Sequence, residues 1–379
     1  MINQQERKHI LIFSLVWLVL QLLLLWHNGI FADGESIKYI DQAQKFLQNG
    51  KFTSNNFIFY STQILLIAAV LKIKAGFWLI ILIQFVFSWW ATFSLYKLAH
   101  YLFNSLTALI AVILFLLNLP LQEFNTFLQT ESLFYSITII TSSYVIRLQQ
   151  FKLKHFLIIF PLLILISVTR PTGLLFIPVV FLYLFFYHFN FITIVQKITL
   201  ALILGFTFFF VLNWALGSGG ELDFILPFIK ENIICGVPSF SDLRDAKSLG
   251  YENSLYGLLS YIFHHFQQFI KLSWLRSIAF WGLLRTYYGM AHNIYLALLF
   301  YPIYILCIFH LILSDKKSRP ALTYCAILIL LTWITVLITC DDWHNRFFLT
   351  ISPYLILFAS PVLANLISRI SNNKISQTL

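Results

Sequence analysis

Long apolar runs with almost no charge are the feature of this sequence that most restricts its fold. A run of about 20 such residues crosses the hydrocarbon core of a bilayer as a helix. Hydrophobic residues make up 59% of the 379-residue chain and charged residues only 11%, whereas a soluble domain has about 25% charged residues. The sequence therefore predicts an all-α polytopic membrane protein whose apolar surface is partly buried by lipid.

We expect about ten transmembrane helices. Uninterrupted candidates lie at 10–27, 77–97, 104–120, 132–148, 198–216, 293–313, 321–340 and 347–366. The stretch 156–188 supplies two more, because Pro171 disfavours helix at the residue before it and divides the run into two shorter helices. The segment 57–73 is short for a span and contains Ser61, Thr62 and Gln63, so we expect it to lie on the outer surface as an interfacial or re-entrant helix.

The distribution of lysine and arginine predicts the orientation, because short cytoplasmic loops carry an excess of both. If 57–73 does not span, one side of the membrane holds most of these cations, namely Arg7, Lys8, Lys97, Arg147, Lys152, Lys154, Lys197, Lys316, Lys317, Arg319, Arg369 and Lys374. The short loops of the other side hold only Arg170 and Arg346. We therefore expect a multi-pass protein of the plasma or inner cell membrane, with both termini in the cytoplasm and the active site outside.

The loop lengths divide the chain into three parts. These are residues 1–216 with a long outer loop at 28–76, an extracytoplasmic region at 217–292, and C-terminal spans at 293–379. Cys235 and Cys340 are both expected outside, where a disulfide between them is one alternative to two thiols. The net charge of +10 is accounted for by the cytoplasmic cations. In the absence of a basic soluble module, no nucleic acid partner is expected.

Two acids at the outer ends of helices are candidates for catalysis. Asp33 follows the first helix and precedes an amphipathic stretch, where partial desolvation would raise its pKa and make it a better base. A helix cap or an ordinary solvated loop acid is the alternative. Glu131 opens the fourth span, where a carboxylate serves either catalysis or only the helix dipole.

Two arginines on the same side are candidates for binding phosphate. Arg170 lies near membrane depth, where a guanidinium needs a partner, and its planar fork matches phosphate oxygens. Snorkelling to lipid headgroups is the alternative. Arg346 ends a short loop that also contains Asp342 and His344, and it is either a second phosphate or sugar contact or part of a solvated turn. No ligand spacing indicates a defined metal site.

In this order, the landmarks resemble the GT-C superfamily of membrane glycosyltransferases, and most nearly its branch of protein O-mannosyltransferases and lipid A aminoarabinose transferases. The resemblance rests on Phe31-Ala32-Asp33-Gly34-Glu35, the interfacial segment 57–73, Thr130-Glu131-Ser132, and Arg346-Phe347-Phe348-Leu349-Thr350-Ile351-Ser352-Pro353. It is firmest along 1–216. Two features depart from the family pattern: Phe59-Tyr60-Ser61-Thr62 stands where the family usually has His-Pro-Pro, and Glu131 stands where many relatives have Asp.

The resemblance implies an inverting glycosyltransferase that moves a sugar from a polyprenyl-phosphate donor to a glycan, lipid or protein acceptor, without a cofactor or metal. It implies that Asp33 is the general base, with Glu131 as a second catalytic acid, and that Arg170 and Arg346 hold the donor phosphate. Further substrate-binding residues are then expected at Glu35, Tyr39, Tyr60, Asp342 and His344.

Two other functions fit the same composition. A polymerase or ligase of surface polysaccharide would grip its substrate with arginines of region 217–292, namely Arg244, Arg276 and Arg285. A flippase or transporter of a lipid-linked sugar would usually show inverted repeats and polar residues at the bilayer midplane. The sequence shows no repeat, and its acids gather toward one surface, so we favour an enzyme at the membrane interface.

Overall fold

The computed structural model describes residues 4–189, 193–217, 225–237, 252–313 and 316–377. These residues form helices joined by short connections, with two isolated β-bridges, Phe31–Phe127 and Ile234–Asp341. The α-helices are α1 (Gln4–Asn28), α2 (Glu35–Asn49), α3 (Ser61–Lys72), α4 (Trp78–Leu102), α5 (Ser105–Leu116), α6 (Leu119–Glu123), α7 (Glu131–Ile146), α8 (Leu153–Thr169), α9 (Phe176–Tyr187), α10 (Ile194–Gly217), α11 (Ile225–Ile229), α12 (Leu255–His264), α13 (Phe266–Gly282), α14 (Met290–Leu313), α15 (Arg319–Ile338) and α16 (Arg346–Gln377). Three short 3₁₀ helices are η1 (Asn55–Tyr60), η2 (Phe124–Thr126) and η3 (Pro171–Leu175).

The prediction of a helical multi-pass membrane protein is confirmed. Within the described residues, six helices are long and apolar enough to cross a membrane, namely α1, α4, α10, α14, α15 and α16. A seventh span results if α5 and the segment 119–126, which are bent by 66°, cross together. The other expected spans are shorter: α7 has 16 residues, α8 has 17 and α9 has 12. The number of ten spans therefore stays a prediction.

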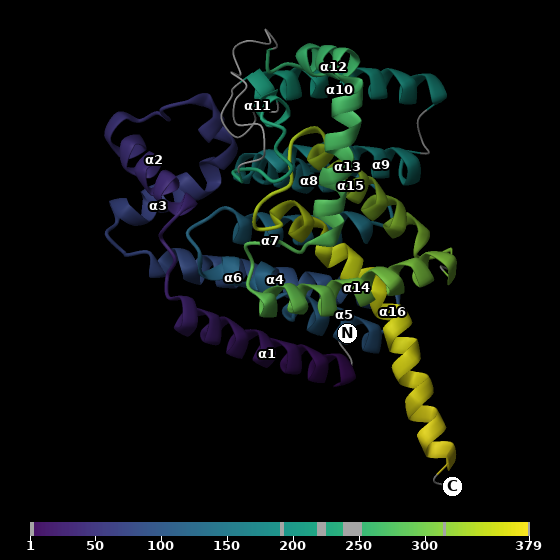
Figure 1. The fold of residues 1–379 in the computed structure, drawn as a ribbon. Helices are drawn as coiled ribbons and strands as arrows, with labels where there is room; N and C mark the ends of the chain where they lie inside the picture. Colours follow the sequence, from purple (N-terminus) through teal and green to yellow (C-terminus); the bar gives the residue numbers. More distant parts are fainter. Residues whose placement is uncertain (1–3, 190–192, 218–224, 238–251, 314–315, 378–379) are drawn as a thin grey trace.

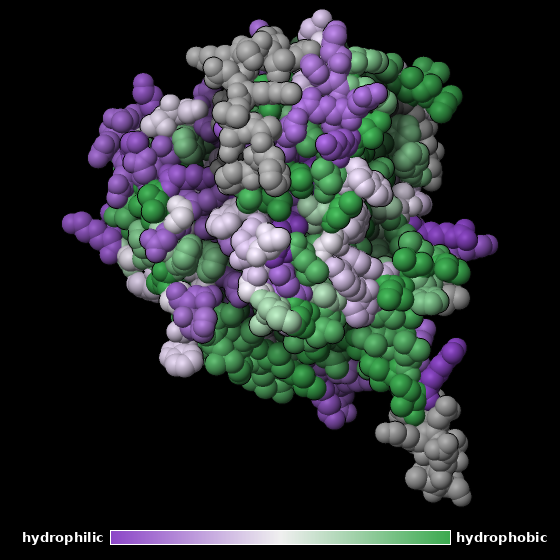
Figure 2. All heavy atoms as spheres, viewed as in Figure 1, coloured by the Kyte–Doolittle hydropathy of each residue, from purple (hydrophilic) through white to green (hydrophobic). Residues whose placement is uncertain are grey.

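The helices pack into one bundle with polar ends. α4 contacts α7, α5 and α1, while α14 contacts α16 on another side of the same bundle. α2 and α3 lie beyond one end of the long helices, at the left of Figure 1. Figure 2 shows hydrophilic surface over these two helices and a broad hydrophobic surface over the bundle beside them. This division is what a bilayer requires of a protein that spans it.

The segment 57–73 forms a short helix, and its place at the membrane interface stays a prediction. It consists of the end of η1 and the 12-residue helix α3, and such a helix rises only about 18 Å, well short of the hydrocarbon core. Its apolar side packs on α2 in a small core of its own, with Tyr39, Ala43, Ile64 and Ile67 almost fully buried. This core fixes α2 at the end of the bundle.

Region 217–292 is more structured than the long loop that the sequence predicts. Its described part contains α11, α12 and α13, and α13 packs along α15. α11 and α12 have only 5 and 10 residues, and the 17 residues of α13 include several polar ones, so composition alone did not separate these helices from a loop. Arg244, one of the three arginines named for the polymerase alternative, lies outside the described residues.

The break between α8 and η3 depends on a glycine. The amide of Gly173 donates to the carbonyl of Arg170 at 2.8 Å and closes the turn. A Cβ atom on Gly173 would lie 2.2 Å from the carbonyl oxygen of Ile166 in the last turns of α8. Because that oxygen belongs to the backbone, it cannot rotate away as a side chain would. Gly173 therefore lets the chain reverse closely enough to set Arg170 at the helix end.

We expect Gly173→Ala to lower the free energy of unfolding by about 1–3 kcal/mol, the usual cost of forcing extra volume into a packed site. The measurement is thermal unfolding of the purified protein in detergent. Gly205→Ala is the matched control, because Gly205 lies in a helix and a Cβ there meets no atom within 4 Å. Equal melting temperatures for the two variants would contradict the steric role of Gly173.

Candidate functional site

Four helix ends bring charged side chains together at the end of the bundle next to α2. Glu35 begins α2, Glu131 begins α7, Arg170 follows the last residue of α8, and Arg346 begins α16. Asp342, in the loop before α16, completes the group. We call these five residues the ion network. Carboxylates in the first turn of a helix are also favoured by its dipole, so Glu35 and Glu131 suit their positions locally as well.

Arg346 is the centre of the ion network. Its Nη2 donates to Glu35 at 2.8 Å, and its Nη1 donates to a second oxygen of Glu35 and to Glu131 at 2.7 Å. Its Nε donates to Asp342 at 2.9 Å. Every guanidinium nitrogen is thus engaged, and the residue is only 6% exposed. Arg346 is therefore a structural hub in this state rather than an open phosphate-binding group.

Arg170 is less fully engaged than Arg346. Its Nη1 donates to Glu131 at 2.5 Å, and this is the one side-chain hydrogen bond that it makes to the described residues. Glu131 is fully buried and accepts from both arginines, with the Thr130 hydroxyl 3.3 Å from its second oxygen. The Nε and Nη2 groups of Arg170 are thus left to bind an additional acceptor at the site.

Three further residues of the site come from α2 and η1. The Lys38 Nζ lies 3.8 Å from Glu35 and about equally far from two rings, 5.0 Å from the Tyr39 centroid and 5.3 Å from that of Tyr60. The two tyrosine rings lie 5.6 Å apart and are both buried. With Lys38 included, three cations face the three carboxylates of the network, so the formal charges cancel. Buried charges are tolerated only when they are paired in this way.

The sequence-based predictions did not include Lys38, although its spacing of three residues from Glu35 indicates that the two side chains share one face of a helix. Residues three apart on a helix lie on the same face, so Lys38 had to follow Glu35 into the site. Burial lowers the pKa of the Lys38 ammonium, while the charge of Glu35 opposes that effect. Tyr135, one turn after Glu131, was missed as well, and its hydroxyl donates to the Arg346 carbonyl at 3.1 Å.

Glu35 and Asp342 do not serve as bases in this state. Burial alone would raise the pKa of Glu35, but hydrogen bonds from Arg346 and the charges of the surrounding cations lower it to about 2. The same balance of burial against Arg346 lowers the pKa of Asp342 to about 2. Both carboxylates therefore stay ionised at neutral pH and have little tendency to take up a proton.

Asp33 lies beside the network but outside its ion pairs. It is two residues before Glu35, which places the two Cα atoms within about 7 Å of each other. Its side chain is exposed, so the expectation of a partly desolvated acid is wrong. Its carboxylate makes no hydrogen bond or ion pair with the described residues. Asp33 is thus an accessible, uncommitted carboxylate at the edge of the site.

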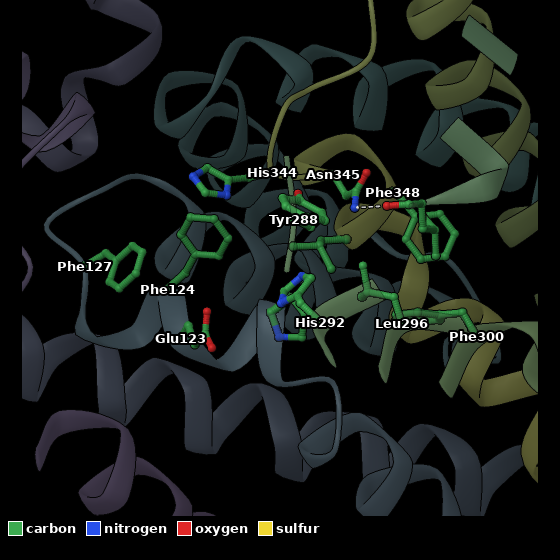
Figure 3. Close-up of a pocket in the computed structure, with 13 residues that line it drawn as sticks. Glu123, Phe124, Phe127, Tyr288, His292, Leu296, Phe300, His344, Asn345 and Phe348 are labelled. Carbon is green, nitrogen blue, oxygen red and sulfur yellow. Dashed lines mark hydrogen bonds between the residues drawn. The ribbon is translucent and has the colours of Figure 1, made fainter. Parts of the chain in front are cut away.

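A cavity of about 80 Å³ lies next to the loop that carries Asp342 and Arg346. Figure 3 shows Glu123 from α6, His292 from α14, and His344 and Asn345 from that loop around it. Glu123 is half-buried, and its carboxylate has no hydrogen bond or ion pair among the described residues. No sequence pattern distinguishes Glu123 from other loop acids, and only its place on this cavity does so.

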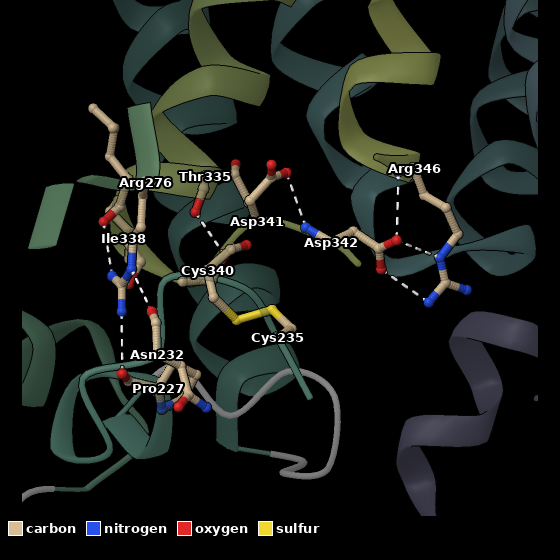
Figure 4. Close-up of a disulfide and its surroundings, with 12 residues drawn as sticks. Pro227, Asn232, Cys235, Arg276, Thr335, Ile338, Cys340, Asp341, Asp342 and Arg346 are labelled. Carbon is tan, nitrogen blue, oxygen red and sulfur yellow. Dashed lines mark hydrogen bonds and ion pairs between the residues drawn. A yellow bond between two sulfur atoms is a disulfide. The ribbon is translucent and has the colours of Figure 1, made fainter. Parts of the chain in front are cut away.

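A brace from region 217–292 holds the loop between α15 and α16 in place. Cys235 and Cys340 form a disulfide with Cα atoms 5.4 Å apart, which resolves the alternative left open by the sequence. Figure 4 shows Asp341 directly after this disulfide and Asp342 reaching Arg346. The backbone on both sides is paired, because the Cys235 amide donates to the Asp341 carbonyl at 2.7 Å. The brace therefore fixes the backbone from which Asp342 and Arg346 enter the ion network.

Two arginines of region 217–292 are committed to this brace. Arg276 is fully buried and donates to the carbonyls of Pro227, Asn232, Leu337 and Ile338. Arg285 is ion-paired with Asp341, which is fully buried. Neither guanidinium is directed to a cavity, so neither suits the substrate-gripping role that a polymerase would need. Among the described residues, no group of three or more His, Cys, Asp or Glu could hold a metal ion.

The comparisons with known proteins add no family to this geometry. No protein-family model matches the chain, and neither the curated proteins nor the solved structures provide a match. The resemblance noted in the sequence accordingly stays a hypothesis, and the ion network is the strongest guide to function.

Proposed function

We propose that this protein is an inverting glycosyltransferase of GT-C type that takes a sugar from a polyprenyl-phosphate donor at the outer face of the membrane. The observation that carries the proposal is the convergence of Glu35, Glu131, Arg170 and Arg346 from four distant segments at one end of the bundle. Scattered caps and snorkelling cations would not be expected to meet in one buried cluster. The accessible Asp33 borders that cluster.

In the proposed reaction, the acceptor hydroxyl or amine loses its proton to Asp33 and attacks the anomeric carbon of the sugar. The bond between that carbon and the phosphate oxygen breaks, and its electron pair stays on the lipid phosphate. Attack opposite the leaving group inverts the configuration. Arg170 would stabilise the charge on the phosphate through its Nε and Nη2 groups, because donors already in place cost no reorganisation.

The residues around Arg170 would have different roles in the proposed reaction. Arg346 would position Glu131, and Glu131 in turn would orient the Arg170 guanidinium, so Arg346 acts through other residues rather than on the phosphate. Tyr39 and Tyr60, whose rings are buried, would support Lys38, which would present a cation at the side of the site next to α3. His344 and the cavity beside it would accommodate part of the sugar or of the acceptor. This assignment changes the expected role of Arg346 from ligand to positioning residue.

Two observations support an outer location for the site. The disulfide Cys235–Cys340 braces the loop that carries Arg346, and disulfides persist in oxidising compartments outside the cytoplasm. Arg147 and Lys152 lie at the opposite ends of α7 and α8 from Glu131 and Arg170, and cations of short loops mark the cytoplasmic side. We therefore place both termini in the cytoplasm of a plasma or inner cell membrane.

We expect Arg170→Gln to weaken binding of polyprenyl phosphate, the leaving group of the proposed reaction, by about 10-fold to 100-fold. Hydrogen bonds to charged groups contribute about 1.5–3 kcal/mol each, which gives that range. Purified protein in detergent is titrated with undecaprenyl phosphate and bound lipid is measured by native mass spectrometry. Arg369→Gln is the control, because Arg369 is exposed near the other end of α16. Equal affinity in wild type and Arg170→Gln would overturn the assigned role of Arg170.

A further inference from the structure

A second cavity lies at the opposite end of the bundle from the ion network. It is open to the exterior, has a volume of about 430 Å³, and is lined by residues of α1, α4 and the connection after α7. Glu131 begins α7, and Arg147, which lines this cavity, directly follows its last residue. A helix of 16 residues rises about 24 Å, so the two sites lie on opposite sides of the membrane.

Two cations face this cavity without a carboxylate partner among the described residues. The Nε of Arg147 donates to the Ser143 carbonyl at 2.8 Å, while both terminal nitrogens of its guanidinium make no hydrogen bond in the described part of the chain. The Lys97 Nζ lies 4.3 Å from the centre of the Phe93 ring. Each residue lines the cavity, and the charge of Arg147 acts on Lys97. Two like charges held together favour an anion between them.

The one acid among the lining residues is already engaged. Glu6 lies 3.1 Å from the Nε2 of His100, another lining residue. Apart from Gln149, the remaining wall is apolar or aromatic, with Ile10, Phe93, Tyr96 and Tyr101. A cavity that combines cations lacking a carboxylate partner among the described residues with aromatic and apolar wall residues matches an amphiphile that has an anionic head.

We propose that this cavity binds the phosphate group of an anionic lipid in the cytoplasmic leaflet. Arg147 would bind two phosphate oxygens with its terminal nitrogens, as guanidinium groups do, and Lys97 would neutralise the remaining charge. The acyl chains would continue along the exposed apolar side of α4, where Val86 and Trp90 lie. Basic pockets between transmembrane helices on the cytoplasmic side bind lipid headgroups of this kind. The inference does not depend on the glycosyltransferase proposal.

The positive-inside rule alone does not account for a cavity with aromatic walls beside Lys97 and Arg147. Cations that only set topology can stand anywhere in a cytoplasmic loop, as the exposed Lys152 and Lys154 do. They need neither a cavity nor aromatic walls. Lys152 and Lys154 therefore provide a matched control, since they are close in sequence to Arg147 and have the same sign of charge but do not line the cavity.

The experiment compares lipid binding by the full-length protein, its Lys97→Gln/Arg147→Gln variant and its Lys152→Gln/Lys154→Gln variant. Phosphatidylglycerol and phosphatidylcholine are titrated into detergent-solubilised protein, and bound lipid is counted by native mass spectrometry. We expect the cavity variant to bind phosphatidylglycerol at least tenfold more weakly and the control variant to bind it within twofold of wild type. Phosphatidylcholine, whose headgroup carries no net charge, should bind weakly to all three proteins.

Two outcomes would overturn the proposal. One is equal loss of phosphatidylglycerol in the two double variants, which would reduce the effect to general surface charge. The other is displacement of the lipid by an equal concentration of soluble glycerol phosphate, which would make a free phosphate the ligand instead. If the double variant does not fold, Lys97→Gln alone replaces it, since Lys97 is exposed; we expect it to bind phosphatidylglycerol about threefold more weakly than wild type, whereas unchanged binding would contradict the site.

Discussion

Replacing Asp33 with Asn is expected to lower the rate of sugar transfer by about 10²-fold to 10⁴-fold, the usual contribution of a general base. The amide keeps the size of the side chain but cannot take the acceptor proton. Donor binding should be unchanged, because the carboxylate makes no contact with the ion network. The measurement is single-turnover transfer from a labelled polyprenyl-phosphate sugar by purified protein, together with undecaprenyl phosphate affinity of the same sample.

Glu123→Gln is the matched control for Asp33→Asn. Both residues carry a carboxylate without a cation partner among the described residues, and both border the site, but Glu123 is half-buried beside the small cavity. We expect less than a tenfold loss in Glu123→Gln. If Glu123→Gln instead shows the large loss of rate and Asp33→Asn the small one, Glu123 is the base and the reaction takes place on the side of the site that faces the cavity. Full activity in both variants would contradict acid–base catalysis by either carboxylate.

Replacing Arg346 with Gln is expected to lower the free energy of unfolding by about 3–5 kcal/mol, the usual result of removing one partner from a buried ion pair. The change leaves Glu35, Glu131 and Asp342 facing only Arg170 and Lys38. Desolvation then acts on carboxylates that have lost their main counter-charge. Thermal unfolding in detergent measures the effect, with Arg369→Gln as a control on the exposed part of the same helix.

A second variant separates the charge of Arg346 from its packing. In Arg346→Gln/Glu131→Gln, one buried anion is removed together with the cation, so part of the lost stability should return. Non-additivity of this kind is expected for residues in direct contact, and here Nη1 of Arg346 lies 2.7 Å from Glu131. A double variant that is less stable than Arg346→Gln alone would contradict the proposed pairing.

Much of the candidate site was accessible from the sequence because membrane proteins rarely keep charges near their spans without a partner. That rule singled out Arg170, while Glu131 and Arg346 were singled out by their positions beside the ends of apolar spans, and the structure brings all three together. The rule could not predict which residues these three would pair with. Glu35 and Arg346 are separated by 311 residues, and pairing over that distance depends on how α2 and α16 pack. The rule also could not distinguish Arg346, whose nitrogens are all engaged, from Arg170, which keeps two for a ligand.

The sequence by itself determined that the chain crosses a membrane several times and that a break falls at Pro171. These properties follow from local chemistry: the length of apolar runs, the geometry of proline, and the distribution of cations. Only the tertiary structure decided that α12 and α13 form part of 217–292, that Cys235 pairs with Cys340, and that Asp33 is exposed. Each of these depends on which surfaces meet after the helices pack, and residue type does not specify that.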